Sequence, residues 1–80
     1  MELYILTCTD ESGAIVLLEV YPDMHKAHLA MVEDHNKKEV ELAEAGHFKD
    51  TFNYMDMNSA TAGDDQVHYR WRIHFRRIQS

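Results

Sequence analysis

Six histidines in 80 residues are the side chains of this sequence that could hold a metal ion. On a helix, His25, His28 and His35 would fall within about 80° of arc, with Glu39 one turn beyond His35. The i, i+3 spacing of His25 and His28 could place two imidazoles near one ion. His35 lies about two turns from His28, too far to share a mononuclear site easily, and no HExxH motif or cysteine pair is present. The spacing favours surface histidines without a ligand role, and we expect no metal or other cofactor.

The sequence offers few groups for covalent catalysis. Cys8 is the only cysteine, and it lies inside a predicted strand, where a small buried hydrophobic side chain is the commoner role. Ser59 is not part of a nucleophile-elbow motif. Glycine-rich phosphate-binding loops are also missing from the sequence. We therefore expect a protein that is not an enzyme.

The segment VHYRWRIHFRR, residues 67–77, holds all four arginines of the chain. Its period of two predicts a strand, and the alternation breaks at Arg77–Ile78. Two sets of side chains project from opposite faces of this strand. Val67, Tyr69, Trp71, Ile73 and Phe75 form an apolar set for the core, and His68, Arg70, Arg72, His74 and Arg76 form a cationic set for the other face.

Charge is distributed unevenly along the chain. Residues 1–66 contain all fourteen acidic residues and only four lysines, a net charge of −10, whereas residues 67–80 carry a net charge of +4. The overall charge of −6 argues against a general nucleic-acid or membrane-surface binder, because such proteins concentrate positive charge over a whole face. The aromatic residues that alternate with the arginines point away from them, which also argues against base stacking.

The elements that position these residues can be read from the apolar pattern. The runs ELYILTCT and AIVLLEVY, separated by DESG, predict a β-hairpin. A helix is expected from Asp23 as N-cap to Gly46 as C′ residue, with Pro22 ending the preceding strand. One helix is favoured over two short ones, although the apolar stripe changes phase near residues 36–38. Residues 47–62 fit a helix, an irregular strand or a loop equally well.

This order of elements predicts one two-layer α+β domain over residues 1–80. It would contain an antiparallel sheet of three to four strands, with one main helix packed on one face. No stretch approaches the roughly 20 apolar residues of a membrane span, and the single cysteine suits a reducing compartment. We expect a cytoplasmic protein that does not enter the membrane.

The uncovered face of this sheet is the predicted interaction surface. With Val16, Leu18 and Val20 in the core, the alternate residues of that strand would share the open face with the arginines. Acidic residues such as Glu2 or Glu19 opposite the arginines would pair with them. The simpler alternative is a solvated strand face whose charges discourage edge-to-edge aggregation. The predicted interface residues are Leu17, Tyr21, Arg70, Arg72 and Arg76.

The succession of LYILTCTDESGAIVLLEVYPDMHKAHLAM and SATAGDDQVHYRWRI resembles small uncharacterised bacterial and phage-type proteins. In those, a β-hairpin ends in a V-[FY]-x-D turn and is followed by a helix and a closing strand with an aromatic–Arg–Trp–Arg character. The resemblance covers most of the chain as an order of elements. It implies the α+β fold and carries no catalytic residue.

The function that these patterns favour is a small non-enzymatic protein-interaction module, an accessory or regulatory protein that associates with itself or another protein. An alternative is an acidic protein that mimics nucleic acid or inhibits a basic partner through its helix. Weak binding of single-stranded nucleic acid is a third, less favoured possibility. The acidic residues of the second hypothesis are Glu33, Asp34, Glu39, Glu41 and Glu44.

Overall fold

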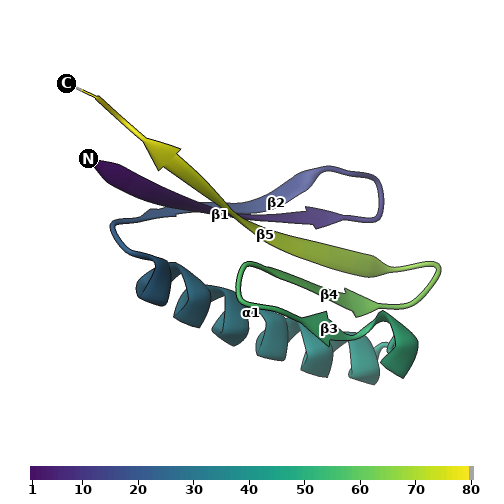
Figure 1. Ribbon diagram of the computed structural model, residues 1–80. Coiled ribbons are helices and arrows are strands. Elements are labelled where there is room, and N and C mark those ends of the chain that lie inside the picture. Colours follow the sequence, from purple (N-terminus) through teal and green to yellow (C-terminus); the bar gives the residue numbers. More distant parts are fainter. Residues whose placement is uncertain (80) are drawn as a thin grey trace.

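The computed structural model describes residues 1–79 and contains one sheet and one long helix (Figure 1). Five strands form an antiparallel sheet in the order β2-β1-β5-β4-β3, and the helix α1 covers one of its faces. In chain order the elements are β1 (Glu2–Asp10), β2 (Ile15–Tyr21), α1 (Met24–Glu44), the 3₁₀ helix η1 (Asp50–Phe52), β3 (Tyr54–Met55), β4 (Ser59–Gly63) and β5 (His68–Arg77).

The prediction of a two-layer α+β fold is confirmed. The sheet has five strands rather than three or four, because the segment whose structure the sequence left open contributes two of them. Of these, β3 is only two residues long, too short for its sequence to show a strand pattern. It is defined by its pairing with β4. The last strand ends at Arg77, where the alternation breaks.

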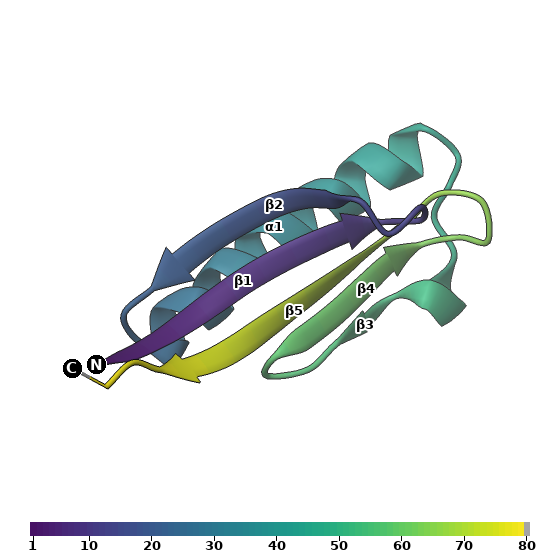
Figure 2. The ribbon, with the colours of Figure 1, turned by 90° about the horizontal axis from the view of Figure 1, so that it is seen from above.

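The first and last strands of the chain lie side by side in the middle of the sheet (Figure 2). β1 pairs with β5 in an unbroken antiparallel register that runs from Glu2 opposite Arg77 to Asp10 opposite Tyr69. On its other side β1 pairs with β2, with a bulge between Cys8 and Thr9. The first and last strands therefore hold the two halves of the sheet together.

A single helix follows the hairpin, as the sequence favoured. Asp23 caps its first turn, since its carboxylate accepts a hydrogen bond from the Lys26 amide at 2.8 Å. Gly46 ends it with φ of 81°, and the His47 amide donates to the Leu42 carbonyl at 2.8 Å. Both signals were visible in the sequence.

The buried stripe of α1 differs in one respect from the apolar pattern. Leu29 and Val40 are apolar but are more than half exposed. The stripe continues instead through His35, four residues after the buried Met31, and only then reaches Leu42. The phase change in the sequence arose because a polar residue occupies this buried position.

Trp71 of β5 lies at the centre of the core, fully buried beneath the helix. Its indole Nε1 donates to the Asp34 carboxylate at 2.7 Å, which satisfies its one polar atom. The helix packs most closely over β4, where Ala60 and Ala62 are small enough to permit a close approach. The remaining buried apolar residues are Leu6, Cys8, Ala27, Met31, Leu42 and Ile73.

Phe75 lies on the helix side of β5 as predicted but remains 46% exposed. The ends of β1 and β5 that carry the termini project away from the helix (Figure 1). Phe75 packs there against Tyr4, with 5.3 Å between ring centroids. This aromatic pair covers the end of the core that the helix does not reach.

Each of the three hairpin turns contains an aspartate that accepts hydrogen bonds from turn amides. Asp10 accepts from the Ser12 hydroxyl at 2.6 Å and from the Ser12 and Ala14 amides, and Asp56 accepts from the Met57 amide at 2.6 Å. The Ser12 hydroxyl bond is the main cause that lowers the pKa of Asp10, and the Met57 amide lowers that of Asp56. Charged aspartates therefore define these turns.

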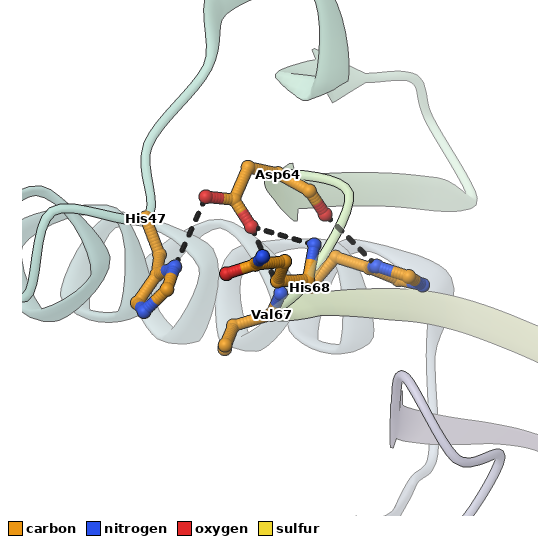
Figure 3. A network of polar contacts seen from close by, with 5 residues as sticks. His47, Asp64, Val67 and His68 are labelled. Carbon is orange, nitrogen blue, oxygen red and sulfur yellow. Dashed lines mark hydrogen bonds and ion pairs between the residues drawn. The ribbon is translucent and has the colours of Figure 1, made fainter.

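Asp64 holds the turn between β4 and β5 (Figure 3). Its carboxylate accepts from the Val67 amide at 2.8 Å and the Gln66 amide at 2.9 Å, and it lies 3.0 Å from His47 Nδ1. Its own carbonyl accepts from His68 Nδ1 at 3.0 Å. The Val67 amide, with help from Gln66 and His47, lowers the pKa of Asp64.

This lowered pKa predicts a pH dependence for Asp64→Asn. A carboxyl with a depressed folded-state pKa stabilises the protein fully above its ordinary titration range and loses that effect as the pH falls through the depressed pKa. We expect Asp64→Asn to lower the Tm at neutral pH and to have little effect near pH 2, measured by circular dichroism. Asp65→Asn, an exposed neighbour, is the control and should leave the Tm unchanged. Equal losses for Asp64→Asn at both pH values would contradict this role of the charge.

Gly63 predicts a second stability difference. Its φ is +127°, and a Cβ atom there would overlap the Val67 carbonyl oxygen and His68 Cα. Gly13 also has positive φ, +87°, but a Cβ atom would enter open space. We expect Gly63→Ala to lower the free energy of unfolding by at least about 2–3 kcal/mol, and Gly13→Ala by about 1 kcal/mol, in urea titrations. Similar losses for the two variants would show that the overlap at Gly63 is relieved without cost.

Candidate interaction surface

The face of the sheet opposite α1 is uncovered among the described residues, and Figure 2 looks onto it. The strand register shows which side chains share this open face. One row crosses four strands, from Leu18 through Thr7 and Arg72 to Ser59. The next rows place Val20 beside Ile5 and His74, and Thr9 beside Arg70 and Thr61.

One half of the open face is apolar. Ile15, Leu18 and Val20 of β2 are between 51% and 60% exposed, and Ile5 of β1 lies beside Val20. We call these four residues the aliphatic patch. Three aliphatic side chains exposed to this extent on one strand, with Ile5 beside them, are typical of a surface that is covered in an assembly.

The other half of the open face is cationic. Arg70, Arg72, His74 and Arg76 of β5 form what we call the cationic strip. Within residues 1–79, Arg77 is the arginine that forms an ion pair, with Glu2 at 2.8 Å, and Glu2 and Arg77 occupy the helix side of the sheet. Arg76 donates to the neighbouring Phe75 carbonyl at 2.8 Å. The guanidinium groups of Arg70 and Arg72 are thus available to a partner.

Glu2 and Glu19 do not pair with the cationic strip, contrary to expectation. Glu19 lies opposite Leu6, a core residue, and therefore projects to the helix side. Along the strands, the open face carries no acidic side chain in the part of the chain that the structure describes. Its positive charge is not neutralised locally.

The predicted placement of Leu17 and Tyr21 on the open face was wrong. Leu17 lies opposite Cys8 and Tyr21 opposite Tyr4, and both pack against the core on the helix side. Burial and the nearby Glu19 carboxylate raise the pKa of Tyr21. The strand is apolar on both sides, so its composition did not reveal which side meets the helix. The position of Tyr21, just before the turn into α1, was the signal that could have done so.

Arg70, Arg72 and Arg76 project from the open face as predicted, and all three are exposed. Sequence reasoning missed the apolar residues that accompany them, because Leu18 and Val20 had been assigned to the core. It also missed Tyr54 and Thr61 at the far edge, since they lie in the segment of unassigned structure. The pairing of β4 with β5 places Thr61 beside Arg70, and the pairing of β3 with β4 places Tyr54 beside Thr61.

The histidines are not all surface residues. His35 is 2% exposed, packs edge-on against Trp71, and donates through Nε2 to the Thr61 carbonyl at 3.0 Å. Glu39 lies 2.8 Å from His35 Nδ1 without aligned hydrogen-bond geometry. His28 donates through Nδ1 to the Met57 carbonyl at 2.8 Å. These contacts give His28 and His35 a structural role between α1 and the sheet.

The acidic residues of α1 are partly engaged within the chain. Asp34 accepts the Trp71 indole proton, Glu39 contacts His35, and Glu41 lies 3.5 Å from Lys38 Nζ. Only two of the five acids named for the nucleic-acid mimic, Glu33 and Glu44, form no such contact within residues 1–79. The acidic helix is less free to meet a partner than its sequence indicates.

The thiol of Cys8 is fully buried, and burial raises its pKa to about 12, with the Asp34 charge adding to the effect. A thiol with this pKa is not a nucleophile at neutral pH. Among residues 1–79, no group of three or more histidine, cysteine, aspartate or glutamate side chains is placed to hold a metal ion. None of the helices described is long and apolar enough to cross a membrane.

The sequence matches no protein-family model, and no significantly similar curated protein or solved structure was found. The resemblance in element order to small bacterial and phage-type proteins therefore assigns no family. The open face of the sheet is therefore the feature of this protein that points to a function.

Leu17 and Leu18 test the assignment of the two faces of β2, because they are adjacent and point in opposite directions. We expect Leu17→Ala to lower the free energy of unfolding by about 1–2 kcal/mol and Leu18→Ala by less than about 0.5 kcal/mol. The measurement is urea unfolding at low micromolar protein concentration, where association does not contribute. A larger loss for Leu18→Ala would reverse the assignment.

Proposed function

We propose that this protein is a small non-enzymatic interaction module that associates through the open face of its sheet, with a second copy of itself as the partner. The observation that carries the proposal is the aliphatic patch on an uncovered face that lacks acidic side chains among the described residues. A cytoplasmic location is part of the proposal, because the single cysteine suits a reducing compartment.

Burial of the aliphatic patch supplies a modest driving force. Ile15, Leu18 and Val20 each have roughly half of their side chain to bury. Full burial of such a side chain stabilises by about 1.5–3 kcal/mol, so the three residues on both copies would contribute about 5–9 kcal/mol. Association costs about 4–15 kcal/mol. With burial of about 9 kcal/mol and an association cost of about 4 kcal/mol, the balance is about −5 kcal/mol, so a weak dimer with a Kd in the high micromolar range is the most that the patch alone supports.

A two-fold arrangement fits the distribution of charge. With the axis along the strands between β1 and β2, the aliphatic patches of two copies would stack face to face, about 10 Å apart. The cationic strip of each copy, carried by β5, would then lie beside the outer edge of the other copy's β2. Glu19 of that edge strand projects to the helix side and does not face the strip. The positive strips would not face each other.

The alternative of an acidic mimic acting through α1 receives less support, since Asp34, Glu39 and Glu41 already have partners within the chain. Asp34 in particular satisfies the buried indole of Trp71 and could not leave it without cost. An inhibitor would have to use Glu33 and Glu44 with few other charges.

Val20→Glu and Val40→Glu form a matched pair for testing the dimer. Both valines are more than half exposed, one on the aliphatic patch and the other on the outer side of α1. We expect the wild type and Val40→Glu to dimerise at protein concentrations between about 10 µM and 1 mM, and Val20→Glu to remain monomeric, because it introduces charge into the stacked patches. Sedimentation equilibrium would measure the difference.

A wild type that stays monomeric over this range would rule out self-association. If Val40→Glu dissociates the dimer as strongly as Val20→Glu, the interface lies on the helix side.

A further inference from the structure

A hollow of about 250 Å³ lies in the open face where β3, β4 and β5 meet. Ser59 and Thr61 of β4 form its middle, with Arg70 and Arg72 on the β5 side and Tyr54 on the β3 side. The hollow is separate from the aliphatic patch, since Thr7 and Thr9 of β1 lie between Leu18 and Arg72 and between Ile15 and Arg70. The apolar contacts of the proposed dimer do not use the residues of the hollow.

The hollow presents hydrogen-bond donors in a regular arrangement. Arg72 lies directly opposite Ser59, and Arg70 opposite Thr61. The two arginines are two residues apart on one strand face, a separation of about 7 Å. Thr61 donates its hydroxyl proton to the Phe52 carbonyl at 2.6 Å. The guanidinium groups, the Ser59 hydroxyl and the side-chain amide of Asn58, which also lines the hollow, are the donors that a ligand could use.

The electrostatics of the hollow favour an anion. No carboxylate lines it, and neither arginine is in an ion pair within residues 1–79. The nearest acid along the chain, Asp56, is held by the Met57 amide and the Tyr54 hydroxyl. Arg70 also borders a neighbouring hollow that contains Asp10 and Glu11, so Arg72 is the cation that belongs to this site alone.

We propose that this hollow binds the phosphate group of a small phosphate monoester. Two guanidinium groups match a dianion, and planar guanidinium groups bind phosphate oxygens in bidentate fashion. A single carboxylate would leave one arginine unpaired. The volume is below the roughly 300–1,000 Å³ of pockets for drug-sized ligands, which restricts the site to the phosphate and a few further atoms.

A titration with inorganic phosphate, O-phosphoserine and serine tests the site. Amide shifts of nitrogen-15-labelled full-length protein would be followed at about pH 7.5 and constant ionic strength. We expect saturable shifts at Ser59, Thr61, Arg70 and Arg72 with both phosphates, in the millimolar range, and none with serine. Comparable affinities would identify the free ion as a sufficient ligand, and tighter binding of phosphoserine would identify the ester.

Arg72→Gln and Arg76→Gln are the matched variants, because both arginines lie on the same face of β5 and only Arg72 lines the hollow. We expect Arg72→Gln to weaken phosphate binding by roughly tenfold or more and Arg76→Gln to leave it unchanged. Equal losses, or shifts that do not saturate, would reduce the effect to general attraction by the cationic strip and overturn the proposal.

Two further titrations distinguish the phosphate site from a nucleic-acid surface and from the dimer interface. A thymidine oligonucleotide that binds far more tightly than phosphate, with shifts along the whole cationic strip, would overturn the proposal in favour of a nucleic-acid surface. The phosphate titration repeated with Val20→Glu should give the same affinity as the wild type. Failure of the dimer and failure of the phosphate site would therefore appear in different experiments.

Discussion

The burial of Trp71 beneath α1 is the constraint on which the rest of the structure depends. Its ring fills the centre of the core, its indole nitrogen is satisfied by Asp34, and His35 packs against it from the helix. Because side chains alternate along a strand, fixing Trp71 on the helix side fixes Arg70 and Arg72 on the other. One buried aromatic residue thus determines the orientation of the cationic strip, and through the pairing of β5 with β1 it determines the faces of the central sheet.

Much of the fold could be predicted from local signals. The hairpin, the N-cap at Asp23, the end of the helix at Gly46 and the alternation of β5 each follow from residues close together in the sequence. The orientation of the three arginines could be predicted for the same reason, since a large aromatic and aliphatic set can be buried only on one side. The sequence was therefore sufficient to predict which side of an element faces the core wherever the other side was clearly polar.

The sequence did not show which side of an element faces the core where both sides have the same polarity. β2 is apolar on both faces, and a shift of one residue exchanges them, so Leu17 and Leu18 could be assigned only by pairing with β1. The helix stripe was obscured because its central buried residue is a histidine. The hollow at Ser59 and Thr61 depends on two strands that are too short to give a pattern, β4, which pairs with β5, and β3, which pairs with β4. These features depend on tertiary contacts.

The adjacency of the two terminal strands has a consequence for synthesis. β1 leaves the ribosome first, but its central neighbour is the last strand to be made. Until then the nascent hairpin has an open hydrogen-bonding edge along β1 and an incomplete core, because Trp71 is still missing. Contacts between residues so far apart in the sequence form slowly because a long loop must close first, so folding is expected to complete only after β5 has left the ribosome. During that interval, the unpaired edge of β1 is a place where another extended chain could pair.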